Sequence, residues 1–114
     1  MPSSNDPLRT ELLRGTLDML VLKTLSIGPM HGYGIAKHIE QVTRDAFRIE
    51  QGSLYPALQR MLQQGWVKAE WSRTANNQSA RFYAITAAGR KQLGIEESGF
   101  AQALAAIRLV MRQA

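Results

Sequence analysis

The chain has 114 residues, 45% hydrophobic and 20% charged, which indicates one globular domain with a modest core and not a disordered segment. It contains no cysteine, which excludes disulfides, thiolate zinc sites and cysteine nucleophiles. Apolar stretches are too short to span a bilayer, and the first residues do not resemble a secretory signal, so we expect a cytoplasmic protein.

The formal net charge of +5 is concentrated in one part of the chain. Residues 1–50 and 93–114 each carry equal numbers of acidic and basic side chains, whereas residues 51–92 hold six Lys or Arg against Glu70 alone. Such localised positive charge is the electrostatic footprint of nucleic-acid binding. A solvated basic face is the alternative interpretation.

Apolar residues at helical spacing predict two helices before residue 45. The first runs from Leu8 or from Thr16 to Ser26, and Gly28-Pro29 breaks it. The second runs from about Gly32 to Thr43. The residues predicted to be buried on these helices are Leu13, Leu17, Leu20, Val21, Thr24, Leu25, Ile35, Ala36, Ile39 and Val42. Residues 47–50 form a short connector.

A third helix is predicted from Ser53 to Gln64, with Ser53 as N-cap, Pro56 as the third helical residue and Gly65 in the left-handed position that ends it. One face is apolar, and the other carries no acid. The apolar residues are Leu54, Leu58, Met61 and Leu62, and the polar face holds Tyr55, Gln59, Arg60, Gln63 and Gln64. Gln can pair with adenine and Arg with guanine, so this segment is predicted to be a DNA recognition helix.

Two strands follow, at Val67 to Arg73 and at Arg81 to Ile85, where apolar and polar residues alternate. The polar segment 74–79 connects them. Trp66 and Trp71 flank the start of this hairpin and are predicted to belong to the core. Thr86 is predicted to cap a last helix that continues to the C-terminus, with a kink at Gly94 and Gly99 left open.

This element order is that of a mainly α (α+β) winged helix-turn-helix, with a two-stranded wing and a C-terminal dimerisation helix. Residues 1–86 are predicted to form the DNA-binding domain and residues 87–114 the dimerisation helix, as one compact unit.

Three stretches resemble the PadR family of bacterial transcriptional regulators, over roughly Leu12 to Leu93. The first comprises residues 15–25 with the Gly-Pro-Met-His-Gly-Tyr-Gly sequence of 28–34. The second is Gln-Gly-Ser-Leu-Tyr-Pro at 51–56 with Arg60 and Gly65-Trp66, and the third is residues 81–90. The length resembles the short subgroup that ends in one C-terminal helix.

The resemblance implies a homodimeric, ligand-responsive regulator, usually a repressor, that binds an inverted repeat in double-stranded DNA. The C-terminal helices of such proteins form the dimer interface, where aromatic residues of some relatives stack on planar ligands. Phe100 stands where a tryptophan is common, which is a departure from that pattern. The effector and the operator sequence are not identified by the resemblance.

The predicted DNA-contacting residues are Tyr33, Lys37, Ser53, Tyr55, Gln59, Arg60, Gln63, Arg73, Asn77, Gln78 and Arg81. Several have a second interpretation. Tyr33 and Tyr55 could be core packing, Arg60 could pair with an acid of another element, and Ser53 is a cap first and a phosphate donor second.

The predicted dimerisation residues are Leu93, Phe100, Leu104, Ile107 and Met111, spaced as a seam for a partner helix. The alternative is that the helix folds back on its own domain.

A winged helix that contacts protein instead of DNA is the second functional hypothesis. Catalysis is the weakest, since there are two histidines, no phosphate-binding glycine loop and no paired carboxylates, and no metal or cofactor is expected.

Overall fold

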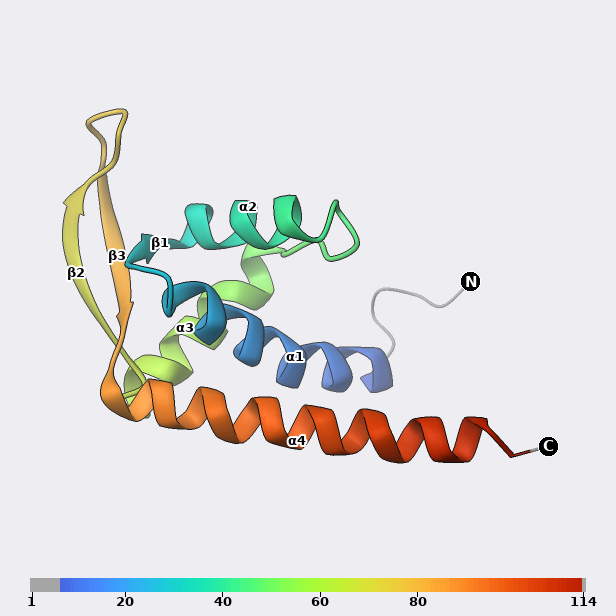
Figure 1. Cartoon of the computed structure of the whole chain (residues 1–114). Helices are drawn as coiled ribbons and strands as arrows, with labels where there is room; N and C mark the ends of the chain where they lie inside the picture. The colour runs from blue at the N-terminus through green and yellow to red at the C-terminus, as the bar shows by residue number, and fades with distance from the viewer. Residues whose placement is uncertain (1–6, 114) are drawn as a thin grey trace.

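The computed structural model describes the backbone of residues 7–113 and the side chains of residues 15–113. In this part of the chain, helices and a small antiparallel sheet form a winged helix, so the predicted α+β fold class is confirmed (Figure 1). The elements are α1 (Pro7–Leu25), β1 (Met30–His31), α2 (Gly32–Val42), α3 (Gln51–Gln63), β2 (Val67–Arg73), β3 (Ser79–Ile85) and α4 (Ala87–Met111).

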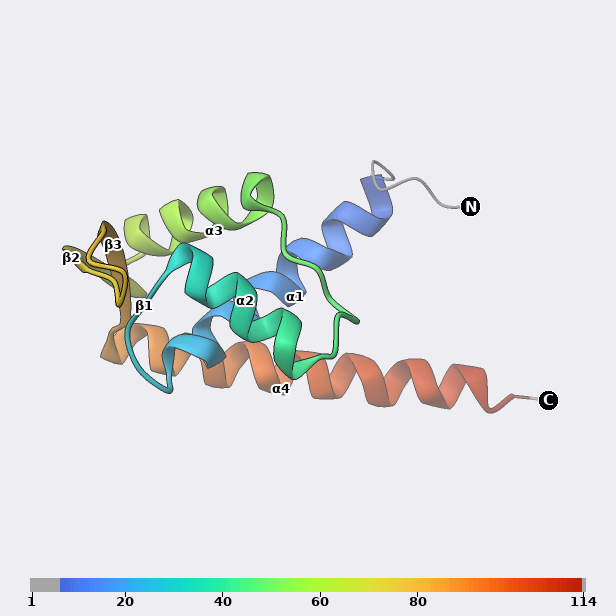
Figure 2. The ribbon, with the colours of Figure 1, turned by 90° about the horizontal axis from the view of Figure 1, so that it is seen from above.

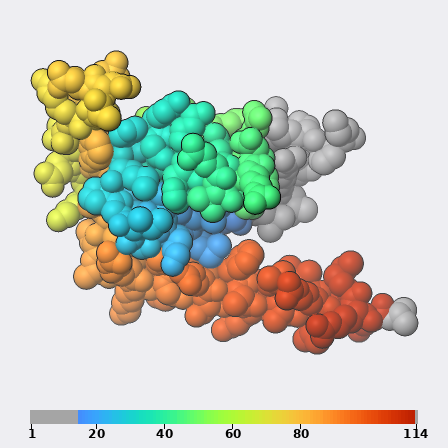
Figure 3. Space-filling model, turned by 45° about the horizontal axis from the view of Figure 1, so that its top comes forward, coloured from blue at the N-terminus to red at the C-terminus, as the bar shows by residue number. Residues whose placement is uncertain are grey.

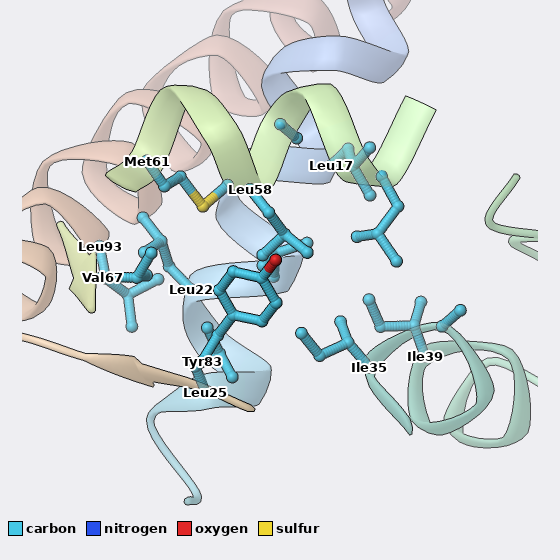
Figure 4. Close-up of a cluster of buried hydrophobic side chains, with 14 residues drawn as sticks. Leu17, Leu22, Leu25, Ile35, Ile39, Leu58, Met61, Val67, Tyr83 and Leu93 are labelled. Atoms are coloured by element: carbon cyan, nitrogen blue, oxygen red, sulfur yellow. The ribbon is translucent and has the colours of Figure 1, made fainter. Parts of the chain in front are cut away.

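The core lies where α1, α2 and α3 meet the base of the hairpin, and Figure 4 shows side chains from each element pointing into it. Leu22, Leu54 and Leu58 are fully buried, and Tyr83 closes the cluster from the sheet. Most of the predicted stripes are therefore confirmed. Val42 is the exception, 68% exposed, because it is the last residue of α2. The side chain of Leu13 lies outside the described ones.

The start of α3 differs from the prediction. The helix begins at Gln51, and its N-cap is Glu50, which makes no side-chain capping hydrogen bond, so Ser53 is not the cap. The amides of Ser53 and Leu54 both donate to the carbonyl oxygen of Glu50 at 3.0 Å, which closes a first turn upstream of the serine. Pro56 is consequently the sixth helical residue, where its missing amide leaves one carbonyl without an α-helical partner.

The sheet contains a third strand that the sequence patterns did not predict, in the order β1-β3-β2. In β1, Met30 pairs with Tyr83 and His31 with Phe82, both antiparallel. Two residues are too few to show the period-two alternation on which strand prediction depends. This short strand places the start of α2 directly beside the wing.

β2 occupies the range predicted for it, but one of its residues does not lie where expected. Trp71 is 70% exposed, so its assignment to the core is wrong, whereas Trp66 is half-buried and packs against the core. Trp71 is paired with Arg81, one residue beyond the part of β3 that pairs with β1, and it lies outside the buried cluster.

α4 is one continuous helix through Gly94 and Gly99, and it runs beneath α1 (Figures 1 and 2). Its N-terminus is joined to the corner between α3 and β2. The hydroxyl of Thr86 accepts from the amide of Gly89 at 3.0 Å, as predicted for the cap, and also donates to the carbonyl of Gly65 at 2.6 Å. The Thr86 amide donates to the carbonyl of Trp66 at 3.0 Å. We call this set of contacts the corner joint.

Two glycines are required at the corner joint. Gly65 has φ +74°, the left-handed conformation predicted for the end of the recognition helix. Gly89 is buried, and a Cβ there would overlap the backbone carbonyl of Trp66. The last helix can therefore approach the corner this closely only with glycine at position 89.

Candidate nucleic-acid interface

The outward face of α3 carries Tyr55, Gln59 and Gln63, which are exposed, while Leu54 and Leu58 on the opposite face are buried. Ser53 is also exposed, in the first turn. The two-faced pattern of the sequence is thus reproduced in the structure, with glutamine amides free to meet a partner outside the protein.

Tyr55 connects α3 to α2. Its side chain is 49% exposed, yet its ring lies against Gly32, where a Cβ would be 3.0 Å from the hydroxyl oxygen. The two interpretations of Tyr55 are therefore compatible, because one edge packs on the supporting helix and the rest faces outward. The contact also places the first turn of α2 close to the recognition helix.

Arg60 makes the alternative contact considered for it. Its Nη2 donates to Oδ1 of Asp18 on α1 at 2.7 Å, and the two side chains are 39% and 16% exposed. The guanidinium is turned toward the body of the protein, which ties α3 to α1. This geometry favours a structural role for Arg60 over base reading.

The start of α2 presents a cation and aromatic rings to the outside. Tyr33 is 58% exposed, and Nζ of Lys37 lies 5.5 Å from its ring centroid, so Tyr33 is not core packing. Nδ1 of His31 accepts from the amide of Gly34 at 3.0 Å and so caps the helix. His31 also packs edge-on against Phe82 of the wing. Helix N-termini favour anions such as phosphate.

The wing tip is held by its own hydrogen bonds. Nη1 of Arg73 donates to the carbonyl oxygen of Asn77 at 2.9 Å, and Asn77 adopts a left-handed conformation with φ 60°. Thr74 and Gln78 close the turn, the amide of Thr74 donating to the Gln78 carbonyl at 2.9 Å. Asn77 therefore shapes the turn, while its side chain and that of Gln78 remain exposed.

Near the middle of the wing, Arg81 is exposed, and its guanidinium carbon lies 5.9 Å from the ring centroid of Tyr83. Trp71 is the residue paired with Arg81 across the ladder. It was not among the predicted contact residues, because an alternating strand pattern cannot tell where along a hairpin the core ends.

The structure brings the predicted residues together only in part. The β1–β3 pairing and the contact between Tyr55 and Gly32 place α2, α3 and the base of the wing in one continuous region. Figure 3 shows the wing rising beside α2 on one face of the molecule, with its tip projecting beyond the helices. Arg60 is turned away from this region.

The predicted dimerisation residues lie apart from it, on α4. Leu93 is 7% exposed and belongs to the core of its own protomer, so it has no surface to offer a partner. Leu104 is half-buried, and the other three predicted side chains are exposed: Phe100, Ile107 and Met111. Ile95, Leu109 and Val110 add further exposed apolar surface that the seam pattern did not include.

The described residues include no group of three or more His, Cys, Asp or Glu that could hold a metal ion. No helix within the same part of the chain is long and apolar enough to cross a membrane.

A supporting helix, a recognition helix and a wing in this order define the winged helix-turn-helix class of transcriptional regulators. The chain belongs to the transcriptional regulator PadR-like family, whose sequence pattern it matches over residues 21–95. This finding confirms the resemblance identified in the sequence. The matched region ends before the exposed half of α4.

Solved structures with the same fold support this assignment. A transcriptional regulator from Clostridium thermocellum has a TM-score of 0.79 and 26% identity, over 86% of this chain and 95% of that one. A PadR family transcriptional regulator from Eggerthella lenta also has a TM-score of 0.79, with 28% identity over 94% of this chain and 91% of its own. An uncharacterised protein of Lysinibacillus sphaericus is 27% identical over 85 residues, which cover 75% of this chain and 78% of that protein.

Proposed function

We propose that the protein binds a specific inverted repeat as a homodimer and represses transcription until a small-molecule effector releases it. The observation that carries this proposal is the outward face of α3, where Gln59 and Gln63 are exposed beside Tyr55 and no acidic side chain interrupts the face. Glutamine amides form paired hydrogen bonds with adenine in the major groove, and a carboxylate there would be repelled by phosphate.

In this proposal the contacts divide into two kinds. Gln59 and Gln63 read base edges, and Tyr55 contacts the duplex at the start of the reading face. The residues proposed to contact phosphate or the minor groove are Tyr33, Lys37, Ser53, Arg73, Asn77, Gln78 and Arg81. Arg60 is left out, because its ion pair with Asp18 directs it toward α1.

The homodimer is proposed on the exposed apolar surface of α4. Single apolar residues on a surface are common, but Phe100, Ile107 and Met111 recur at helical spacing on one side of a helix that Figure 1 shows extending past the body. A partner helix would cover this stripe. Two-fold symmetry then places the recognition helices about one DNA turn apart, ~34 Å, which matches an inverted repeat.

Repression and a response to a small molecule are inferred from the family, and repression is tested separately from binding. A reporter driven by the promoter of its own gene should rise when the gene is deleted. A fall on deletion would instead identify an activator.

Binding is tested with a labelled duplex that carries this promoter region, at moderate salt. Gln59→Ala or Gln63→Ala should relax discrimination at particular base pairs by about 1–3 kcal/mol each, because a paired hydrogen bond is lost. Lys37→Ala should weaken binding to all sequences and reduce the salt slope by about 1. Gln102→Ala, on exposed α4, is the matched control.

Two results would contradict the assignment. If the wild-type protein leaves the duplex unbound, DNA recognition is rejected, and a pull-down that recovers a protein partner without DNA would favour a protein-contact module. If both glutamine variants weaken binding equally for every sequence, base reading by α3 is rejected.

A further inference from the structure

Trp71 is the most exposed aromatic side chain among the described residues, at 70%. It lies on β2, directly across the ladder from Arg81 of β3. Side chains that face each other across a ladder share one side of the sheet, so the indole and the guanidinium lie on the same surface of the wing. The same side carries Val67 and Tyr83 further down, where it meets the core.

Arg81 is held in place beside this indole. Its guanidinium carbon lies 5.9 Å from the ring centroid of Tyr83, whose ring is buried in the core. The Arg81 guanidinium therefore packs against the Tyr83 ring, and Trp71 is the residue opposite Arg81 in the ladder. A positive charge and an exposed aromatic ring thus lie at the same level of the hairpin.

The charges on this side of the wing suit a polyanion. Arg73 and Arg81 share the side of Trp71, whereas Lys68 and Glu70 alternate to the other side of the sheet. Figure 1 shows that the hairpin stands clear of the helices at its upper end, and the surface continues into the wing residues proposed to contact DNA. Among the described residues, no hydrogen bond or ring contact holds the Trp71 indole.

We propose that Trp71 is a further DNA-contacting residue, which lies with its ring against the deoxyribose of the backbone beside the wing and directs its indole N–H to a phosphate. This inference rests on the proposed DNA binding. Apolar rings contact sugars, and the indole nitrogen is a donor with no acceptor function. The contact does not depend on the base, so Trp71 contributes affinity for every sequence.

The test uses the salt dependence of binding. Trp71→Ala should weaken binding to operator and unrelated duplex alike, by about tenfold, near the lower end of what aromatic contacts to nucleotides contribute. Because an indole carries no charge, it releases no counterion, and the slope of log K against log salt should stay that of wild type. Arg81→Ala should weaken binding and flatten the slope by about 1.

Trp71→Phe should lose less affinity than Trp71→Ala, since a ring remains. Ser72→Ala is the matched control, since Ser72 is exposed on the other side of the same strand. Because Trp71 and Ser72 are exposed, Trp71→Ala, Trp71→Phe and Ser72→Ala are all expected to unfold at the wild-type temperature. A flattened salt slope in Trp71→Ala would overturn the proposal, because it would show that the indole acts only by positioning Arg81.

Fluorescence supplies an independent measurement, because the chain has two tryptophans. In Trp66→Phe, emission reports Trp71 alone, and saturating duplex should quench it or shift it to the blue. If Trp66→Phe does not fold, the difference between wild-type and Trp71→Phe emission on titration gives the same information. An unchanged emission from Trp71 in a protein that still binds DNA would overturn this inference and leave the proposed function intact.

A third result would point to another partner. If Trp71 emission changes with protein concentration in the absence of DNA, the ring lies in a contact between copies of the chain, and the proposal is wrong. If wild type binds no duplex at all, the proposed function itself fails, which is a different outcome.

Discussion

The direction of a single side chain in this fold is set by the element packed beside it. Arg60 of α3 turns to Asp18 of α1, an acid of another element, which was one of the two interpretations considered for it. Trp71 was placed in the core and is exposed. Both outcomes depend on which elements lie next to each other, and residue spacing within one element does not contain that information.

Gly89 permits a residue-scale test of the corner joint. Gly89→Ala should lower the free energy of unfolding by about 1–3 kcal/mol, because the added methyl overlaps a backbone carbonyl that cannot move without shifting the end of α3. Chemical denaturation at fixed protein concentration, followed by circular dichroism, measures the change.

Gly94→Ala is the matched control for that measurement. It lies on the same helix, and a Cβ there would have no neighbour within 4 Å. This variant should be more stable than wild type by about 0.4–1 kcal/mol, because alanine restricts the unfolded chain. Equal stabilities of the two variants would show that the close approach at Gly89 is not required.

At the scale of elements, helices and the two long strands were predictable because each is long enough to show its period. The range of β2 was predicted to the residue. The start of α3 was not predictable, because its first turn closes on the backbone carbonyl of Glu50. β1 was not predictable either, because two residues are too few to show a period. The same limit applies to the candidate interface, where the exposed polar face of α3 was predicted but the nearness of α2 to the wing depends on β1.

The start of α2 gives an element-scale prediction. His31→Ala should destabilise the protein by about 1 kcal/mol, because the amide of Gly34 loses its acceptor. His31→Asn should recover most of this loss, since asparagine is among the best N-cap residues. Denaturation midpoints measure both, and a His31→Asn variant no more stable than His31→Ala would reject the capping role.

In the whole molecule, α4 begins inside the region that matches the family and continues beyond it. The family match ends at residue 95, while the helix continues to Met111 with apolar residues exposed along it. Phe100, Ile107 and Met111 of the predicted seam are exposed, whereas Leu93 is buried because α4 packs against the core near its start. That a partner helix covers the exposed residues stays a prediction.

The proposed dimer leads to a prediction for α4. Ile107→Asp should convert the protein to monomers and weaken binding to an inverted repeat at least about tenfold, because a charge would be buried in the apolar seam and the second half-site contact would be lost. Sedimentation velocity measures the oligomeric state. Ala105→Asp, exposed on another side of the same helix, should leave both unchanged.

A monomeric wild type, or an Ile107→Asp variant that stays dimeric, would contradict the seam. In the first case the exposed apolar surface would need another explanation. In the second, the partner would have to contact the other exposed side of α4, where Ile95 and Leu109 lie.

The corner joint has a mechanical consequence for such a dimer. The 25 residues of α4 form a rod about 37 Å long, and Thr86 before it bonds to the carbonyls of Gly65 and Trp66 just after α3. A tilt of about 5° at this end displaces the far end by about 3 Å, given the rise of a helix. Conversely, in the proposed dimer, a ligand that changes the angle between the two α4 helices would change the distance between the two copies of α3. In the proposed dimer, the spacing of the two recognition helices would therefore depend on the angle at which α4 leaves Thr86 and Gly89.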